Sequence, residues 1–164
     1  RSRRRRAVRV RKCYDGFCFA LDAIIPKFEK AGVTLCLENL PSIEAFPDEQ
    51  EVLMLKQRFD TPTLAYWHDF GHGQIREYMG WTRHVDGARE LLPITRGVHI
   101  HDAKPLQNDH LAPGKGEIDF GAFAFYGSDA IIRVFEPSPN VTGTELAESL
   151  RLVEQAWSGA TAPL

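Results

Sequence analysis

The sequence predicts an α/β fold in which four parallel strands alternate with helices, as part of a (β/α)8 barrel. Three observations lead to this prediction. Short, unbroken apolar runs recur along the chain, amphipathic helical patterns lie between them, and each run ends in Glu, Asp or His. Unbroken apolar runs are typical of strands covered on both faces, and their alternation with helices indicates βα units with right-handed crossovers.

The expected strands lie in four runs that begin at residues 33, 63, 97 and 130, namely VTLCLEN, TLAYWHDFGH, GVHIHD and AIIRVFEP. The polar residues at their ends are Glu38, Asp69, His99 and Glu136, which are separated by 31, 30 and 37 residues. A barrel of about 250 residues allots roughly 31 residues to each unit, and its active site lies at the C-terminal ends of the strands. We therefore expect these four side chains to share one site.

Amphipathic helical patterns separate the expected strands. Residues 19–32 place apolar side chains on one face, Gly32 can close that helix, and Pro26 either kinks it or marks its start. Three further patterns span residues 49–59, 85–92 and 143–157. Thr142 or Thr144 is the expected cap of the last helix, because a threonine hydroxyl can accept a free backbone N–H at a helix start.

The chain of 164 residues, 43% of them hydrophobic, is long enough for one domain. Its first twelve residues hold eight of the 20 Lys and Arg and no acidic residue, which leaves a formal charge of −10 on the remainder. We expect residues 1–16 to be a disordered or non-native basic leader and residues 17–164 to form the partial barrel. Cys13, Cys18 and Cys36 match neither a zinc nor a disulfide pattern, so we expect thiols. The absence of long apolar runs predicts a cytoplasmic protein that does not bind membranes.

Five motifs in this order and spacing resemble those of the xylose isomerase-like TIM barrels, a superfamily that includes sugar phosphate isomerases and epimerases and the family-2 AP endonucleases. The motifs are LEN at 37–39, DFGH at 69–72, HIHD at 99–102, HLAPGKGEIDF at 110–120 and FEP at 135–137. They correspond to the last four βα units, so the resemblance implies the C-terminal half of a TIM barrel. The expected partner is a second copy or a missing N-terminal half, because half a barrel leaves open sheet edges.

The resemblance also implies site residues and an activity. Glu38, Asp69, His99 and Glu136 would bind one divalent metal; this oxygen-rich set favours Mn²⁺, Mg²⁺ or Co²⁺, with Zn²⁺ as an alternative. His72 and His110 would bind the substrate. The implied function is that of a metal-dependent isomerase or epimerase of a sugar or sugar phosphate. Its catalytic residues Glu38 and Glu136 would transfer a proton through a metal-stabilised enediolate.

Two other functions stay open. A zinc-dependent AP endonuclease would need further histidines from the first half and an aspartate two residues before His110, where Asn108 stands beside Asp109. This makes nucleic acid an unlikely partner. A non-catalytic half-barrel that only associates with a partner is the second alternative. The sequence does not identify the sugar or the physiological metal.

The remaining histidines and the segment after HIHD have structural expectations. His68 should face the helices, and His84 lies in a polar connection where no special role is expected. We expect His101 to point away from His99 and to pack or to support a ligand. Asp102 is expected to orient a neighbour or to cap the next segment, and the loop APGKGEIDF to pack over the site.

Overall fold

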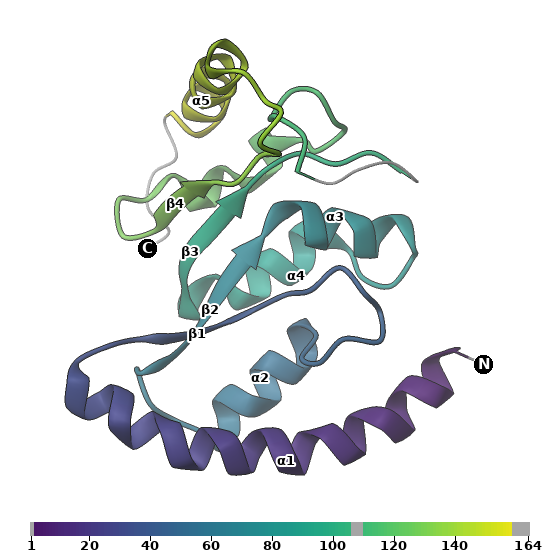
Figure 1. Ribbon diagram of the computed structural model, residues 1–164, viewed down its shortest axis with the longest axis vertical. Helices are drawn as coiled ribbons and strands as arrows, with labels where there is room; N and C mark the ends of the chain where they lie inside the picture. Colours follow the sequence, from purple (N-terminus) through teal and green to yellow (C-terminus); the bar gives the residue numbers. More distant parts are fainter. Residues whose placement is uncertain (1, 106–109, 159–164) are drawn as a thin grey trace.

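A computed structural model describes residues 2–105 and 110–158, and within them a sheet of four parallel strands (Figure 1). The strands follow one another in chain order as β1 (Leu35–Glu38), β2 (Leu64–Asp69), β3 (Thr95–Ile100) and β4 (Ile132–Phe135). All three pairings are parallel. The expected α/β architecture and the four predicted strand positions are thereby confirmed.

Helices connect the strands (Figure 1). They are α1 (Ser2–Ala31), α2 (Glu49–Arg58), α3 (Phe70–Tyr78), α4 (His84–Leu91) and α5 (Gly143–Trp157), with the 3-10 helices η1 (Leu92–Ile94) and η2 (Phe120–Gly127). The sequence did not predict α3, which begins directly after β2. Thr142 caps α5, which decides between the two expected threonines. No helix in the described part of the chain has the length and apolar character that a membrane span requires.

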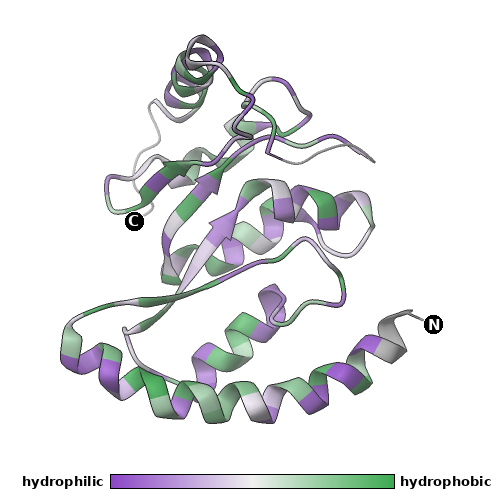
Figure 2. Cartoon of the chain, viewed as in Figure 1, coloured by the Kyte–Doolittle hydropathy of each residue, from purple (hydrophilic) through white to green (hydrophobic). Residues whose placement is uncertain are grey.

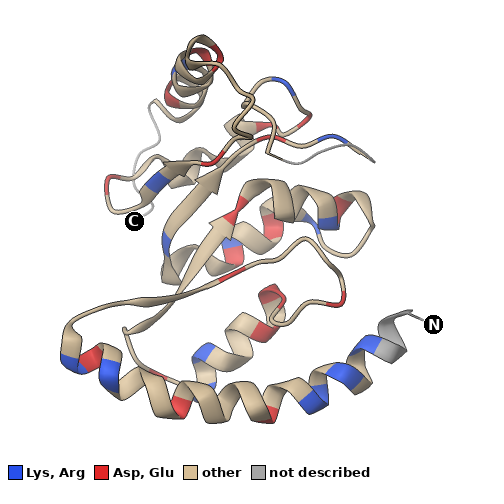
Figure 3. Ribbon diagram, in the orientation of Figure 1, with Lys and Arg blue, Asp and Glu red and all other residues tan. Residues whose placement is uncertain are grey.

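The N-terminal segment differs from the expected disorder, because residues 2–16 belong to α1. Figure 3 shows basic segments along this part of the helix. The Arg6 guanidinium is buried; its nitrogens lie 2.5 Å from Glu51 Oε1 and 3.0 Å from Asp48 Oδ2, and it stacks over Trp81. These contacts hold α1 to the start of α2. Whether residues 1–16 are native stays a prediction.

The helices cover one face of the sheet and form two apolar clusters with it. One cluster joins β1 and β2 to α1 and α2 through side chains such as Leu37, Tyr66 and Leu55. The other joins β3 to α4, η2 and α5 through side chains such as Val98 and Ile100. Figure 2 shows hydrophobic and hydrophilic residues alternating along these helices, as expected for helices with one buried face. We call this covered side the outer face.

The opposite side, the inner face, is largely uncovered. The parallel register pairs Gly97 with Trp67 and Ile132, and these residues alternate with those of the outer face. The Trp67 ring fills the space above Gly97, where an added Cβ would lie 2.3 Å from it. Ile132 and Val134 are 58% and 38% exposed. The inner face therefore has a polar end, where the strands terminate, and an open apolar part below it.

Candidate metal and substrate site

The four expected metal ligands meet at the C-terminal end of the sheet, where the carboxylates of three of them surround a ring nitrogen of the fourth, His99. His99 Nδ1 lies 3.0 Å from Glu38 Oε1, 3.3 Å from Glu136 Oε2 and 3.8 Å from Asp69 Oδ2. Parallel pairing produces this convergence, because Asp69 and His99 are register partners and Glu38 closes the neighbouring strand. Three carboxylates thus surround a single imidazole.

This donor set fits a divalent cation. The donor atoms of Glu38, Asp69 and His99 all lie within 4.8 Å of one another, and Asp69 and Glu136 form a second such group with His101. Donors that share one ion at about 2.1 Å lie at most about 4.2 Å apart, so the separations within each group are close to those that one ion requires, and Asp69 belongs to both groups. Clustered carboxylates repel one another, and a cation offsets that repulsion.

The Asp69 carboxylate is fully buried and held in place from two sides. Its Oδ1 accepts the backbone N–H of His72 at 2.7 Å and so caps α3, and His101 Nε2 lies 3.0 Å from Oδ1 and 3.1 Å from Oδ2. Burial by itself raises the pKa of the Asp69 carboxyl, but the hydrogen bonds from the His101 ring and the His72 backbone N–H, with the electrostatic influence of the two imidazoles, outweigh it and the pKa is lowered. Asp69 is therefore an ionised donor.

Asn39 is a site residue that sequence reasoning missed. Its buried side chain joins two strand ends: Nδ2 donates to the Asp69 carbonyl at 2.8 Å, and the Asp69 N–H donates to Oδ1 at 2.7 Å. The amide continues the β1–β2 ladder one step beyond Glu38 and fixes the distance between the two carboxylates. The sequence signal that could have identified Asn39 is its place in the motif LEN, where an amide side chain directly follows the carboxylate that ends the strand.

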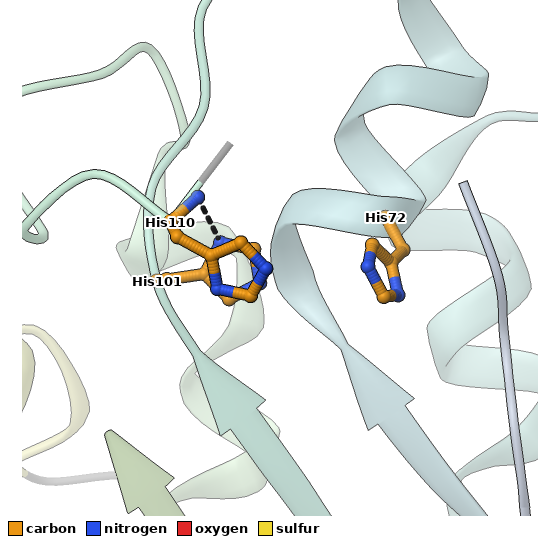
Figure 4. Close-up of side chains that lie close together, drawn as sticks. All are labelled: His72, His101 and His110. Carbon is orange, nitrogen blue, oxygen red and sulfur yellow. Dashed lines mark hydrogen bonds between the residues drawn. The ribbon is translucent and has the colours of Figure 1, made fainter. Parts of the chain in front are cut away.

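His72 and His110, the expected substrate residues, each contact the backbone beside one glutamate. His72 Nδ1 lies 2.9 Å from the Asn39 carbonyl oxygen, and His110 Nδ1 lies 2.7 Å from the Glu136 carbonyl oxygen. A carbonyl only accepts, so Nδ1 carries a proton in both rings, and Nε2 is an acceptor whenever the ring has a single proton. Their rings lie 6.2 Å apart, with His72 on α3 and His110 on the facing loop (Figure 4).

His101 does not point away from His99, so that expectation was wrong. Residues two apart on an extended chain lie on the same side, and both rings reach Asp69. The His101 ring is buried and stacks on His110 with centroids 4.0 Å apart (Figure 4). His72, His101 and His110 together form a cluster of three imidazoles beside the carboxylates.

Asp102 orders the loop that follows His110, in agreement with its expected role. Its carboxylate accepts the backbone N–H groups of Gly114, Gly116 and Ile118 at 2.8 to 3.0 Å. Next to this loop a cavity of about 710 Å³ opens, lined by residues that include His110, Leu111, Lys115, Glu136, Asn140 and Val141. A small polar molecule in this cavity would touch both His110 and Glu136.

A second pair of histidines lies on the outer face. His68 Nε2 lies 3.0 Å from His84 Nε2, and both rings are buried. Burial lowers the pKa of His68 to about 3 and that of His84 well below its usual range, so both rings are neutral. The structure confirms the outward orientation of His68. It differs from the polar connection expected for His84, which is a core residue.

Comparison with known proteins agrees with this architecture. Residues 2–125 match the family model described as xylose isomerase-like TIM barrel. The chain belongs to this family. Within it, the four strands form a partial barrel with Glu38 and His99 in contact at the C-terminal end of the sheet.

Two solved structures resemble this member of the xylose isomerase-like family. One is a D-tagatose 3-epimerase-like protein, with a TM-score of 0.65 and 21% identity over 83% of this chain and 51% of that one. The other is the E. coli 3-keto-D-glucoside 4-epimerase YcjR, with a TM-score of 0.65 and 19% identity over 82% and 51% of the two chains. Both likenesses concern the fold, and the chain spans about half the length of each structure.

A curated relative is the uncharacterized protein MJ1614 of Methanocaldococcus jannaschii, which is 27% identical over 99 residues. That stretch is 58% of this chain and 35% of the relative, so the chain spans about a third of the relative's length. Asn108 and Asp109, which bear on the endonuclease alternative, lie outside the described residues.

Proposed function

We propose that this chain is the metal-binding and proton-transferring half of a sugar isomerase or epimerase. The observation that supports the proposal is the approach of three carboxylates to His99 Nδ1 at the strand ends. Glu38, Asp69, His99 and Glu136 would hold Mn²⁺, Mg²⁺, Co²⁺ or Zn²⁺. When bound, such an ion polarises the carbonyl and hydroxyl oxygens of a sugar and increases the acidity of the neighbouring C–H.

The proton transfer falls to the two glutamates. Glu38 lies on β1 and Glu136 follows β4. Because β1 and β4 are the two edge strands of the sheet, the two carboxylates approach the site from opposite edges. One removes the proton beside the carbonyl and leaves an enediolate; the other returns a proton to the opposite face or to the adjacent carbon. His72 and His110 accept substrate hydroxyls through Nε2, because their Nδ1 atoms bind backbone carbonyls.

Four further βα units would complete this barrel, supplied by the rest of a longer polypeptide or by a second copy. The chain spans about half of the two solved structures, and Ile132 and Val134 of the inner face are exposed. Completion would cover these side chains and add loops to the substrate pocket. Substrate specificity would depend on those loops.

The test measures metal binding first and proton transfer second. Melting with and without each of the four metals should show a metal-dependent rise in Tm. Ketohexoses and ketopentoses, free and phosphorylated, are then incubated with the metal-loaded chain in D₂O, and mass spectrometry reports deuterium entry beside the carbonyl. Glu38→Gln and Glu136→Gln should each lower the exchange rate at least about 100-fold.

Glu44→Gln is the matched control, because Glu44 is exposed and pairs with Arg9 away from the site. The control should exchange at the rate of the unmodified chain. Exchange that persists in both site variants would refute the assigned glutamates. A Tm that none of the metals changes would instead support a non-catalytic half-barrel.

A zinc-dependent phosphodiesterase is the second candidate, favoured by the cluster of His72, His101 and His110. Against it, His101 already contacts Asp69 and a backbone N–H through its two ring nitrogens. Nicking of abasic-site DNA by the zinc-loaded chain would support this candidate. Binding that disappears in moderate salt without nicking would remove it.

A further inference from the structure

His101 stands where three segments of the site meet. It directly follows β3, its Nε2 faces the N-terminus of α3, and its Nδ1 faces the loop at His110. The side chain is 0% exposed. An added Cβ on Gly71 would lie 2.0 Å from His101 Cε1, so the third residue of DFGH leaves the space that this ring fills.

The hydrogen bonds of His101 fix its tautomer. The backbone N–H of His110 can only donate, and it lies 2.8 Å from His101 Nδ1, so Nδ1 has no proton (Figure 4). A neutral imidazole then carries its proton on Nε2. That proton points at Asp69, whose two carboxylate oxygens lie 3.0 and 3.1 Å away.

The two bonds restrain groups that the proposed reaction needs together. Asp69 is a proposed metal ligand, and second-layer hydrogen bonds that orient a ligand typically change metal affinity 10- to 100-fold. His110 has a positive φ of 57°, a conformation rare for residues with a Cβ, and the bond from its N–H helps to hold that backbone. One buried ring therefore connects the ligand to the substrate-binding loop.

We propose that His101 is a positioning residue which, as the Nε2–H tautomer, orients Asp69 for metal binding through one ring nitrogen and fixes His110 for substrate binding through the other. This inference rests on the proposed function in its roles for Asp69 and His110. The hydrogen-bond arrangement itself does not depend on a bound metal or sugar.

The first experiment determines the tautomer in the metal-free chain. Labelling histidine rings with ¹⁵N and recording their NMR shifts identifies which nitrogen of His101 carries the proton. We expect protonated Nε2 and unprotonated Nδ1. A proton on Nδ1 overturns the proposal whatever the chain binds, which separates its failure from that of the proposed function.

The second experiment separates the two bonds with two substitutions. His101→Asn keeps an acceptor at the δ position for the His110 N–H but removes the donor to Asp69. Its Kd for Mn²⁺ should rise about 10- to 100-fold, while hydrogen exchange of the His110 amide stays slow. His101→Gln keeps a donor at the ε position, so the Kd for Mn²⁺ should stay near its original value, while the His110 amide exchanges about 10-fold faster.

His101→Ala should change both measurements, and circular dichroism confirms that each variant is folded. Equal changes in metal affinity and amide exchange in the Asn and Gln variants would indicate a packing role alone and overturn the proposal. If the unmodified chain binds none of Mn²⁺, Mg²⁺, Co²⁺ and Zn²⁺, the proposed function fails, and the ring nitrogens together with the His110 amide still decide the inference.

Discussion

Two groups of histidines on opposite faces of one sheet have opposite surroundings. On the outer face, His68 and His84 lie 3.0 Å apart among aromatic rings, and their Nδ1 atoms contact the neutral Tyr66 hydroxyl and Gln74 amide oxygen. On the inner face, His99 lies among three carboxylates, and His101 contacts one of them. The outer pair is buried, whereas His99 remains 23% accessible.

This difference shows that partners, and not burial alone, decide what a histidine can do. Burial of the outer rings outweighs the opposing influence of the Asp69 charge on His68, so the pKa values of both rings fall and they act as neutral core residues. His101 is equally buried, yet its contact with Asp69 gives it a polar role. The inner group therefore has the surroundings that the proposed metal and substrate binding requires, while the outer group stabilises the fold.

The largest expected effect is on the free energy of unfolding, which should depend on pH because of the outer pair, His68 and His84. Both pKa values are lower in the folded chain than the ordinary value of 6.5. The unfolded chain therefore binds more protons below pH 6.5, and stability is lost as pH falls from 6.5 towards 3. Between pH 6.5 and 5, His68 with its folded pKa of about 3 should cost about 1.6 kcal/mol in the free energy of unfolding, and His84 should add a loss of the same sign.

Urea denaturation at a series of pH values measures this loss. The double variant His68→Leu/His84→Leu should have a flatter profile between pH 6.5 and 5, because neither apolar residue can take up a proton. The lowered pKa of Asp69 acts at lower pH, outside this window. If the free energy of unfolding of the double variant depends on pH as steeply as that of the unmodified chain, the outer pair does not cause the loss of stability.

A smaller effect, in metal affinity, should distinguish the two faces. His99→Gln removes the imidazole at the centre of the carboxylates and should raise the Kd for Mn²⁺ about 100-fold, or about 2.7 kcal/mol. His68→Gln is the matched control and should leave that Kd unchanged. Isothermal titration measures both values; an equal loss in both variants would mean that the two faces are not functionally separate.

The smallest effect comes from two glycines of α3 that contact opposite groups. An added Cβ on Gly71 would lie 2.0 Å from the His101 ring, and one on Gly73 would lie 2.5 Å from the His84 ring. Each Gly→Ala change should destabilise the chain by about 1 to 2 kcal/mol, because overcrowding exceeds the helix-propensity gain of about 1 kcal/mol. Only Gly71→Ala should also weaken metal binding.

Thermal melting and Mn²⁺ titration of the two alanine variants test this separation. Metal binding that weakens equally in both would show that α3 transmits disturbance between the faces. Unchanged stability in both would show that the rings move aside without cost.

Much of this architecture could be predicted from local patterns. The apolar runs identify the four strands, and the proposed ligands Glu38, Asp69, His99 and Glu136 stand at or beside the strand ends, where parallel pairing brings them together. Helix α3 could not be found in this way, because it starts directly after β2 and is capped by Asp69, a residue already assigned to the metal.

The remaining errors concern long-range contacts. His84 looks like a polar loop residue, and only the packing of α4 against β2 and η2 shows that it is buried. The early arginines look unstructured, yet Arg6 reaches Glu51 across 45 residues. Asn39 gains its role from a strand 30 residues further on. The spacing of residues within one helix or strand does not predict these contacts, because they join elements that are far apart in the sequence.

Trp67 fills the inner face over Gly97, and its ring lies 5.2 Å from that of His99. Emission from its indole should therefore respond when an ion or a sugar enters, with Co²⁺ quenching it strongly and Mg²⁺ weakly. The fold thus carries a natural optical reporter beside the candidate site, and occupancy can be followed without attaching a dye.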